Sequence, residues 1–157
     1  MSRKMDAETR RALIEKYREG PAVLEAALRE VPDADLDHAA EGWTPRQVAH
    51  HVADSEMTSA VRLRRLIAED GPQISGYDEE LFARRLHYSE RPIEGSLEAV
   101  RGARASSLAL LEVLTEEEWA RQGTHSESGS YSVTDWLRIY AAHCHDHADQ
   151  IRRARRA

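Results

Sequence analysis

The sequence predicts an all-α protein built as a bundle of four long helices. Ala, Leu, Arg and Glu dominate the composition and Phe occurs only once, which favours helices over strands. Four long segments carry apolar residues three and four positions apart, the spacing of one helix face. No series of segments alternates with the period of two that strands require. A length of 157 residues suits one such domain, which we expect to span residues 1–157.

The first helical region contains a break whose effect the sequence leaves open. Residues 7–18 form one helical segment and residues 21–31 another, with Gly20-Pro21 between them. Proline is tolerated in the first turn of a helix and kinks a helix when it lies inside. The sequence therefore allows either a new helix from Pro21 or one kinked helix. Residues 32–36 are then expected to form a turn or a single helical turn.

The clearest helix boundary is the sequence Thr44-Pro45-Arg46-Gln47. It combines an N-cap threonine, a proline at the first helical position and a glutamine three residues after the cap, which is a capping box. We expect this helix to run from Pro45 to about Glu69. His50 is about 100° around the axis from His51 and is expected at the helix flank. The predicted inward face consists of Val48, His51, Val52, Ser55, Ser59, Leu63, Leu66 and Ile67.

A long connection follows from Gly71 to about Gly95, with a short helix expected over residues 78–87. Such a connection is long enough to return along a helix of about 36 Å, the length of 24 residues at 1.5 Å each. We therefore expect a crossover that places the second and third long helices parallel. Ser96 is a candidate N-cap for the third long helix, over residues 97–114.

The last part of the chain leads into a second histidine-bearing helix. Thr115 is expected to cap a short helical turn that ends at Trp119, and residues 121–131 read as a loop or a small hairpin. A weaker capping box over residues 132–135 opens the last helix, expected from Val133 to about Arg155. Its predicted inward face consists of Trp136, Tyr140, His143, Cys144, His147 and Ile151.

Composition and charge exclude several classes of function. The formal net charge of −6 opposes general affinity for nucleic acid. No apolar run approaches 18 residues, so no membrane span is expected, and the N-terminal sequence lacks the apolar run of a signal peptide. Cys144 is the single cysteine, which excludes an internal disulfide and makes a reducing cytoplasm the expected compartment. The basic residues 152–156 are expected to complement the dipole of the last helix.

Three histidines on two predicted inward faces form a candidate metal site. His143 and His147 are four residues apart and therefore lie on one helix face, whereas His145 lies about 200° from His143 and should point away. His51 on the earlier helix is the candidate third ligand. Three imidazoles with one open position are typical of a catalytic zinc-type site, although imidazole also suits nickel, copper and iron. The alternative is that these residues are hydrogen-bonded core histidines or a polar helix patch.

Other polar residues near the three histidines are weaker candidates for a role in the metal site. Cys144 is either a ligand or nucleophile, or a buried structural cysteine. The candidates for accepting hydrogen bonds from ligand N–H groups are Asp54, Asp146 and Asp149, which otherwise form a solvated face. The histidines in connectors, which we expect to face water, are His38, His87 and His125.

The segment from Gly42 to Ser55, GWTPRQVAHHVADS, resembles the start of the second helix in the DinB/YfiT superfamily. Ile74 with Tyr77-Asp78-Glu79, and the terminal His143-x-x-x-His147, also resemble YfiT-like metal-dependent hydrolases, and the resemblance covers nearly the whole chain in order. It implies a four-helix bundle of up-down-down-up topology and a cytoplasmic homodimer. It also implies one zinc or nickel ion per subunit, on histidines that carry over as His51, His143 and His147.

The resemblance leaves three functions open. The first is a divalent-metal-dependent hydrolase in which a metal-bound water is the nucleophile. The second is a metal-dependent S-transferase that uses a low-molecular-weight thiol such as bacillithiol or mycothiol as its thiolate. The third is a non-enzymatic protein that binds a metal or a small molecule. A small-molecule substrate is the expected partner, with no nucleic acid and no membrane, and the sequence shows no catalytic side chain beyond the metal-held nucleophile.

Overall fold

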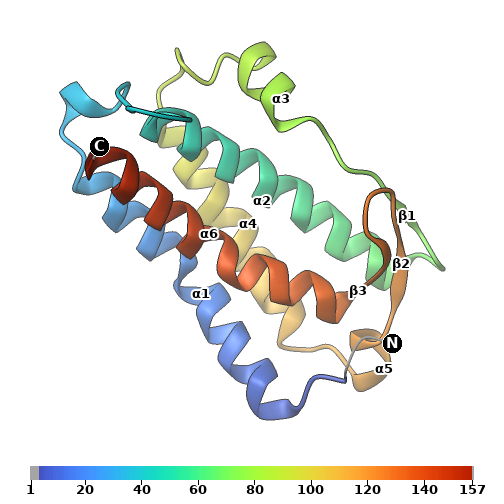
Figure 1. Cartoon of the computed structure of the whole chain (residues 1–157). Coiled ribbons are helices and arrows are strands. Elements are labelled where there is room, and N and C mark those ends of the chain that lie inside the picture. Colours follow the sequence, from blue (N-terminus) through green and yellow to red (C-terminus); the bar gives the residue numbers. More distant parts are fainter. Residues whose placement is uncertain (1–3, 157) are drawn as a thin grey trace.

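Four long helices form the body of the protein in the computed structural model, which describes residues 4–156 (Figure 1). They are α1 (Ala7–Arg29), α2 (Pro45–Ala68), α4 (Glu94–Leu111) and α6 (Val133–Arg156). α1 and α6 run parallel to each other, and α2 and α4 run parallel in the opposite direction, so the predicted up-down-down-up order is confirmed. Within the described residues, no helix combines the length and apolarity that crossing a membrane requires.

The shorter elements lie between the long helices. The 3₁₀ helix Asp33–Asp35 follows α1, and the crossover from α2 to α4 carries β1 (Gln73–Ile74) and α3 (Glu79–Arg85). α5 (Glu116–Trp119) leads to a hairpin of β2 (Gln122–His125) and β3 (Gly129–Ser132). β1 pairs with β2 in parallel and β2 pairs with β3 antiparallel, in the order β1-β2-β3. The hairpin was one of two predicted alternatives; β1 was not predicted, because two residues are too few to show a strand period.

The helix boundaries confirm the capping box of α2 and correct the start of α4. Thr44 accepts from the Gln47 backbone, and the Gln47 side chain accepts from the Thr44 backbone. α4 begins at Glu94 and ends at Leu111, three residues earlier at each end than predicted. Ser96 does not cap this helix, because it lies inside the first turn and its hydroxyl bonds His50. α1 continues through Pro21 as one helix, which settles the alternatives left by the sequence.

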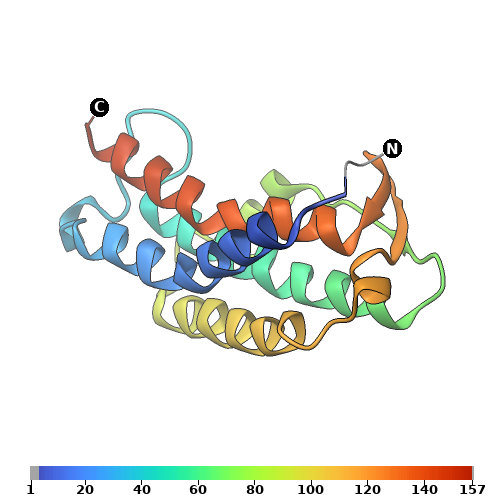
Figure 2. The same cartoon turned by 90° about the horizontal axis from the view of Figure 1, so that it is seen from below.

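A polar layer divides the buried interior into two apolar cores. The hairpin-end core includes Trp136, Leu63 and Leu111, and the loop-end core, at the opposite end of the bundle, includes Leu24, Val52 and Ile151. The four long helices pack side by side around this interior (Figure 2), and each contributes residues to the layer. Its buried polar side chains are Glu56 and Ser59 on α2 and Arg104 and Ser107 on α4, and they meet Tyr17 and Gly20 of α1 and Tyr140 and Cys144 of α6 at the edges of the two cores. The candidate histidines lie next to this layer, between α2 and α6.

Candidate metal centre

The structure brings His51, His143 and His147 together. Each offers one ring nitrogen to a cluster whose ligand atoms all lie within 4.8 Å of one another. The ring centroid of His51 is 5.8 Å from that of His143 and 4.8 Å from that of His147, and the last two are 4.6 Å apart. α2 supplies one ring and adjacent turns of α6 supply two, as their spacing in the sequence predicts.

Aromatic side chains hold two of the rings in place. Trp43, just before the N-cap of α2, packs edge-on against His51 with ring centroids 4.9 Å apart. Tyr140, one turn before His143 on α6, packs edge-on against that ring at 5.6 Å. These contacts limit the rotation of the imidazoles, so the cluster is held before any ligand arrives.

Burial keeps two of the three imidazoles neutral. Burial, reinforced by the neighbouring histidines, lowers the pKa of His51 from 6.5 to about 3. Burial and His143 likewise lower the pKa of His147 to about 4. A neutral imidazole has the free lone pair that a metal ion needs, whereas an imidazolium does not. Both rings are therefore competent ligands at neutral pH.

The outward ring nitrogens differ in their partners. Nδ1 of His143 lies 3.1 Å from Oε1 of Glu56, and Nδ1 of His147 lies 2.7 Å from Oε1 of Gln150. Both partners are acceptors, so each Nδ1 donates its proton and each Nε2 keeps a free lone pair. Nδ1 of His51 is buried with no hydrogen-bond partner among the described residues. Three imidazoles that converge, two of them with an Nε2 lone pair free, fit a site that a cation completes.

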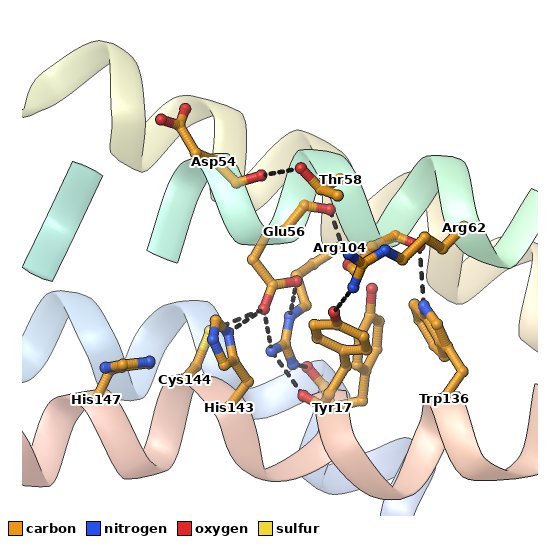
Figure 3. Close-up of polar contacts among 12 residues, drawn as sticks. Tyr17, Asp54, Glu56, Thr58, Arg62, Arg104, Trp136, His143, Cys144 and His147 are labelled. Atoms are coloured by element: carbon orange, nitrogen blue, oxygen red, sulfur yellow. Dashed lines mark hydrogen bonds and ion pairs between the residues drawn. The ribbon is translucent and has the colours of Figure 1, made fainter. Parts of the chain in front are cut away.

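A buried ion pair adjoins the cluster and was not predicted. Figure 3 shows Glu56 extending from α2 between His143 and the guanidinium of Arg104. Glu56 is fully buried, Arg104 is 2% exposed, and Nη2 of Arg104 lies 2.7 Å from Oε1 of Glu56. The available signal was a pair of opposite charges on inward positions of two helices. Glu56 lies four residues after Val52, and Arg104 four after Val100.

His50 lies on the flank of α2 that faces the crossover, and this flank is buried, which the sequence did not predict. It is 1% exposed, and its ring nitrogens lie 2.7 Å from the Ser96 hydroxyl and 3.0 Å from the Arg91 carbonyl oxygen. The crossover from α2 to α4 covers this side of α2, so the flank of the helix is itself an interior surface.

The remaining candidates have other surroundings. Asp54 accepts a hydrogen bond from the Tyr88 hydroxyl, and both Asp146 and Asp149 are exposed. The acceptors for ligand N–H groups are therefore Glu56 and Gln150, not the three aspartates. His145 lies outside the cluster, near Lys16 of α1, as its helical angle predicts.

Cys144 is poorly suited to be a nucleophile. Its side chain is fully buried, and burial raises the pKa of its thiol to about 12. The reactive thiolate would therefore be scarce at neutral pH.

Comparison with known proteins identifies the family of this chain. The sequence profile of the DinB superfamily matches residues 16–151. The chain belongs to the DinB superfamily. A relative from Oceanobacillus iheyensis is 36% identical over 133 residues, covering 83% of this chain and 77% of its own. YfiT from Bacillus subtilis is 32% identical over 141 residues, covering 88% and 79%. Both are named as candidate metal-dependent hydrolases.

Solved structures of YfiT and of a second four-helix bundle protein share the fold. Bacillus subtilis YfiT, described as a candidate metal-dependent hydrolase with an unusual four-helix bundle topology, superposes with a TM-score of 0.92 and 30% identity. The match covers 99% of this chain and 91% of YfiT. Another four-helix bundle protein has a TM-score of 0.65 at 27% identity, covering 92% of this chain and 99% of its own.

Proposed function

We propose that this protein is a divalent-metal-dependent hydrolase whose metal is held by His51, His143 and His147. The observation that carries the proposal is the convergence of three imidazoles from two helices within 4.8 Å. Two of them are held neutral by burial, and the names of relatives in the family point to the same chemistry. Three nitrogen ligands leave a tetrahedral ion one position short, which is the catalytic and not the structural arrangement.

The side chains of this site bind and orient; they do not provide an obvious second acid or base. A divalent ion held there would supply Lewis acidity and make a water at its open position acidic near neutral pH. The chain's own part is to present three lone pairs and to fix two of the rings through Trp43 and Tyr140. Glu56 and Gln150 accept hydrogen bonds from Nδ1 of His143 and His147. Because His51 is buried and His143 and His147 are half-buried between α2 and α6, water has limited access to the cluster.

Metal content and a hydrolysis panel test the proposal. Protein purified without an affinity tag should contain about one zinc or nickel per chain, or take up one of them when it is added. The loaded protein should hydrolyse at least one member of a panel of esters, amides and phosphoesters, and both properties should be lost in His51→Ala. A wild-type chain that neither contains nor binds a divalent ion would contradict the proposal.

A metal-dependent thiol S-transferase is the second candidate, and one observation bears on it. Cys144 is buried with its pKa raised to about 12, so the chain offers no reactive thiol of its own. Transfer would need an external low-molecular-weight thiol at the open position. Incubating the loaded protein with such thiols and an electrophile separates the two functions, because transfer consumes thiol in a metal-dependent way and hydrolysis does not.

We also propose a cytoplasmic homodimer that acts on a small molecule, as the resemblance to YfiT-like proteins implies. The buried unpaired thiol of Cys144 is compatible with a reducing compartment. Light scattering on the purified protein tests the dimer, because a mass of one chain, 17.8 kDa, would contradict it.

A further inference from the structure

We propose that Glu56 is a positioning residue of the metal centre, and that the Gly20-Pro21 pair inside α1 makes this role possible. Glu56 contacts His143 but holds no place in the ligand cluster itself. The inference rests on the proposed metal centre and extends it to all four long helices. It assigns functions to a buried ion pair and to a proline inside α1 that the three ligands do not explain.

Arg104 locks the Glu56 carboxylate from one side. Nε of Arg104 donates to Oε2 at 2.9 Å and Nη2 donates to Oε1 at 2.7 Å, a bidentate pair. Both Glu56 oxygens accept from the permanently charged guanidinium, as an ionised carboxylate does, so this group acts as an acceptor toward its other neighbours.

An acceptor in this place decides the tautomer of His143. Oε1 of Glu56 lies 3.1 Å from Nδ1 of His143, so the proton of the neutral ring stays on Nδ1 and Nε2 carries the lone pair. A carboxylate partner also makes the imidazole a stronger base and therefore a stronger ligand. His147 has only the neutral amide of Gln150 in the same role, so His143 should be the best-oriented ligand of the three.

Pro21, inside α1, leaves a carbonyl oxygen free to accept a hydrogen bond from Arg104. Pro21 has no backbone N–H, so the Tyr17 carbonyl four residues earlier loses its helical hydrogen bond. Nη1 of Arg104 donates to that carbonyl at 2.7 Å, and Nη2 donates to the Tyr140 carbonyl at 2.8 Å. The guanidinium also lies over the Tyr17 ring, 4.0 Å from its centroid.

Gly20 leaves room for the guanidinium. A Cβ atom at this position would lie 2.7 Å from Nη1 of Arg104 and 3.0 Å from Cβ of Cys144. Any larger residue must therefore move Arg104 or push α1 away from α6. The pair Gly20-Pro21 thus creates a free acceptor and an open space at one point of the bundle, and Arg104 occupies both.

Two variants test the inference, with zinc affinity from chelator competition as the readout. Arg104 and His143 together use both oxygens of Glu56 as acceptors, and Glu56→Gln leaves only one. The substitution should therefore weaken zinc binding about 10- to 100-fold. Gly20→Ala leaves every ligand and Glu56 intact but displaces Arg104, and should weaken zinc binding in the same direction. Because the two act through one chain of contacts, their effects in the double variant should fall short of the sum of the single effects in free energy.

Two controls separate positioning from general damage. Gly102→Ala makes the same substitution inside α4, where a Cβ would meet nothing within 4 Å, and should leave zinc affinity unchanged. Gln150→Leu removes the neutral partner of His147 and should weaken zinc binding less than Glu56→Gln does. In metal-free protein, ¹⁵N chemical shifts should show His143 protonated on Nδ1 in the wild type and a growing Nε2-protonated population in Glu56→Gln.

The measured zinc affinities and the His143 tautomer decide whether the inference holds. Wild-type zinc affinity in a folded Glu56→Gln or Gly20→Ala protein would overturn the inference, as would an unchanged His143 tautomer in Glu56→Gln. If Glu56→Gln does not fold, Gly20→Ala decides the question alone. A wild-type chain that binds zinc but hydrolyses nothing would remove the proposed activity and leave this inference standing, whereas a chain that binds no divalent ion would remove both.

Discussion

His50 and His51 are neighbours on α2 and are almost equally buried, at 1% and 2% exposed, yet their surroundings are opposite. Both ring nitrogens of His50 have partners, in the Ser96 hydroxyl and the Arg91 carbonyl of the crossover. His51 faces α6, where its neighbours are two further imidazoles and its Nδ1 has no partner in the described part of the chain.

The difference shows what separates a structural histidine from a ligand. Burial does not separate them, because both rings are buried; their neighbours do, since His50 bonds the crossover and His51 lies in a cluster of three imidazoles. A ring with both nitrogens matched stabilises the fold by itself, whereas a ring packed against two other imidazoles gains most from a cation that all three can bind. The two residues should therefore respond in opposite ways to substitution and to metal.

The largest expected effect is on metal content. His51→Leu should abolish stoichiometric binding of zinc or nickel, because two imidazoles on one helix leave the site incomplete. His50→Leu should keep one ion per chain, since neither of its nitrogens belongs to the cluster. Elemental analysis of both folded variants measures the metal content. Loss of metal in His50→Leu would contradict the different roles assigned to His50 and His51.

Metal should next stabilise the wild type and His50→Leu but not His51→Leu. At a free metal concentration about 1,000 times Kd, binding to the folded state alone contributes about 4 kcal/mol, or roughly 8–16 °C in Tm for a chain of this size. Differential scanning fluorimetry with zinc and with a chelator measures the shift. An equal shift in His51→Leu would mean that the ion binds elsewhere.

Acid should destabilise the metal-free protein through His51 and His147. Their pKa values in the folded protein, about 3 and about 4, lie below the ordinary value of 6.5, so between these limits the unfolded chain binds more protons. Stability is therefore highest above pH 6.5 and falls as the pH drops, by roughly 1.4 kcal/mol per pH unit for each ring. Urea unfolding from pH 7 to pH 5 in chelator should show a shallower slope in His51→Leu.

The smallest effect should appear in chelator at neutral pH. His50→Leu leaves the Ser96 hydroxyl and the Arg91 carbonyl without their partner and should cost about 1–3 kcal/mol. His51→Leu removes an unmatched buried nitrogen and should cost less, or stabilise the metal-free fold. Urea denaturation gives both values, and a larger loss in His51→Leu would reverse the assignment of the two roles.

Local sequence signals predicted the frame of the protein. The capping box of α2, the proline inside α1 and the spacing of His143 and His147 are each encoded within a few residues, and each appears in the structure as predicted or as one of the stated alternatives. The convergence of His51 with the α6 pair followed from inward positions on two helices.

What sequence reasoning missed depends on contacts between distant segments. Glu56 and Arg104 are charged, and a charge inside a helix pattern is read as solvent-exposed unless its partner is known. Their partnership spans 48 residues and requires the packing of α2 against α4. The burial of His50 likewise depends on where the crossover lies, and the start of α4 shifted because Ser96 bonds that ring and not its own helix end.

Pro21 also limits how far the site can be transplanted. A designer who copied only the three histidines into another four-helix bundle would carry over the ligands without the carbonyl of Tyr17 that this proline releases. An uninterrupted helix in place of α1 would keep that carbonyl for itself, and a buried arginine would lose one of the acceptors that hold it. The part that would have to be copied is therefore a set of four helices, one of them with an internal proline, and not a three-residue motif.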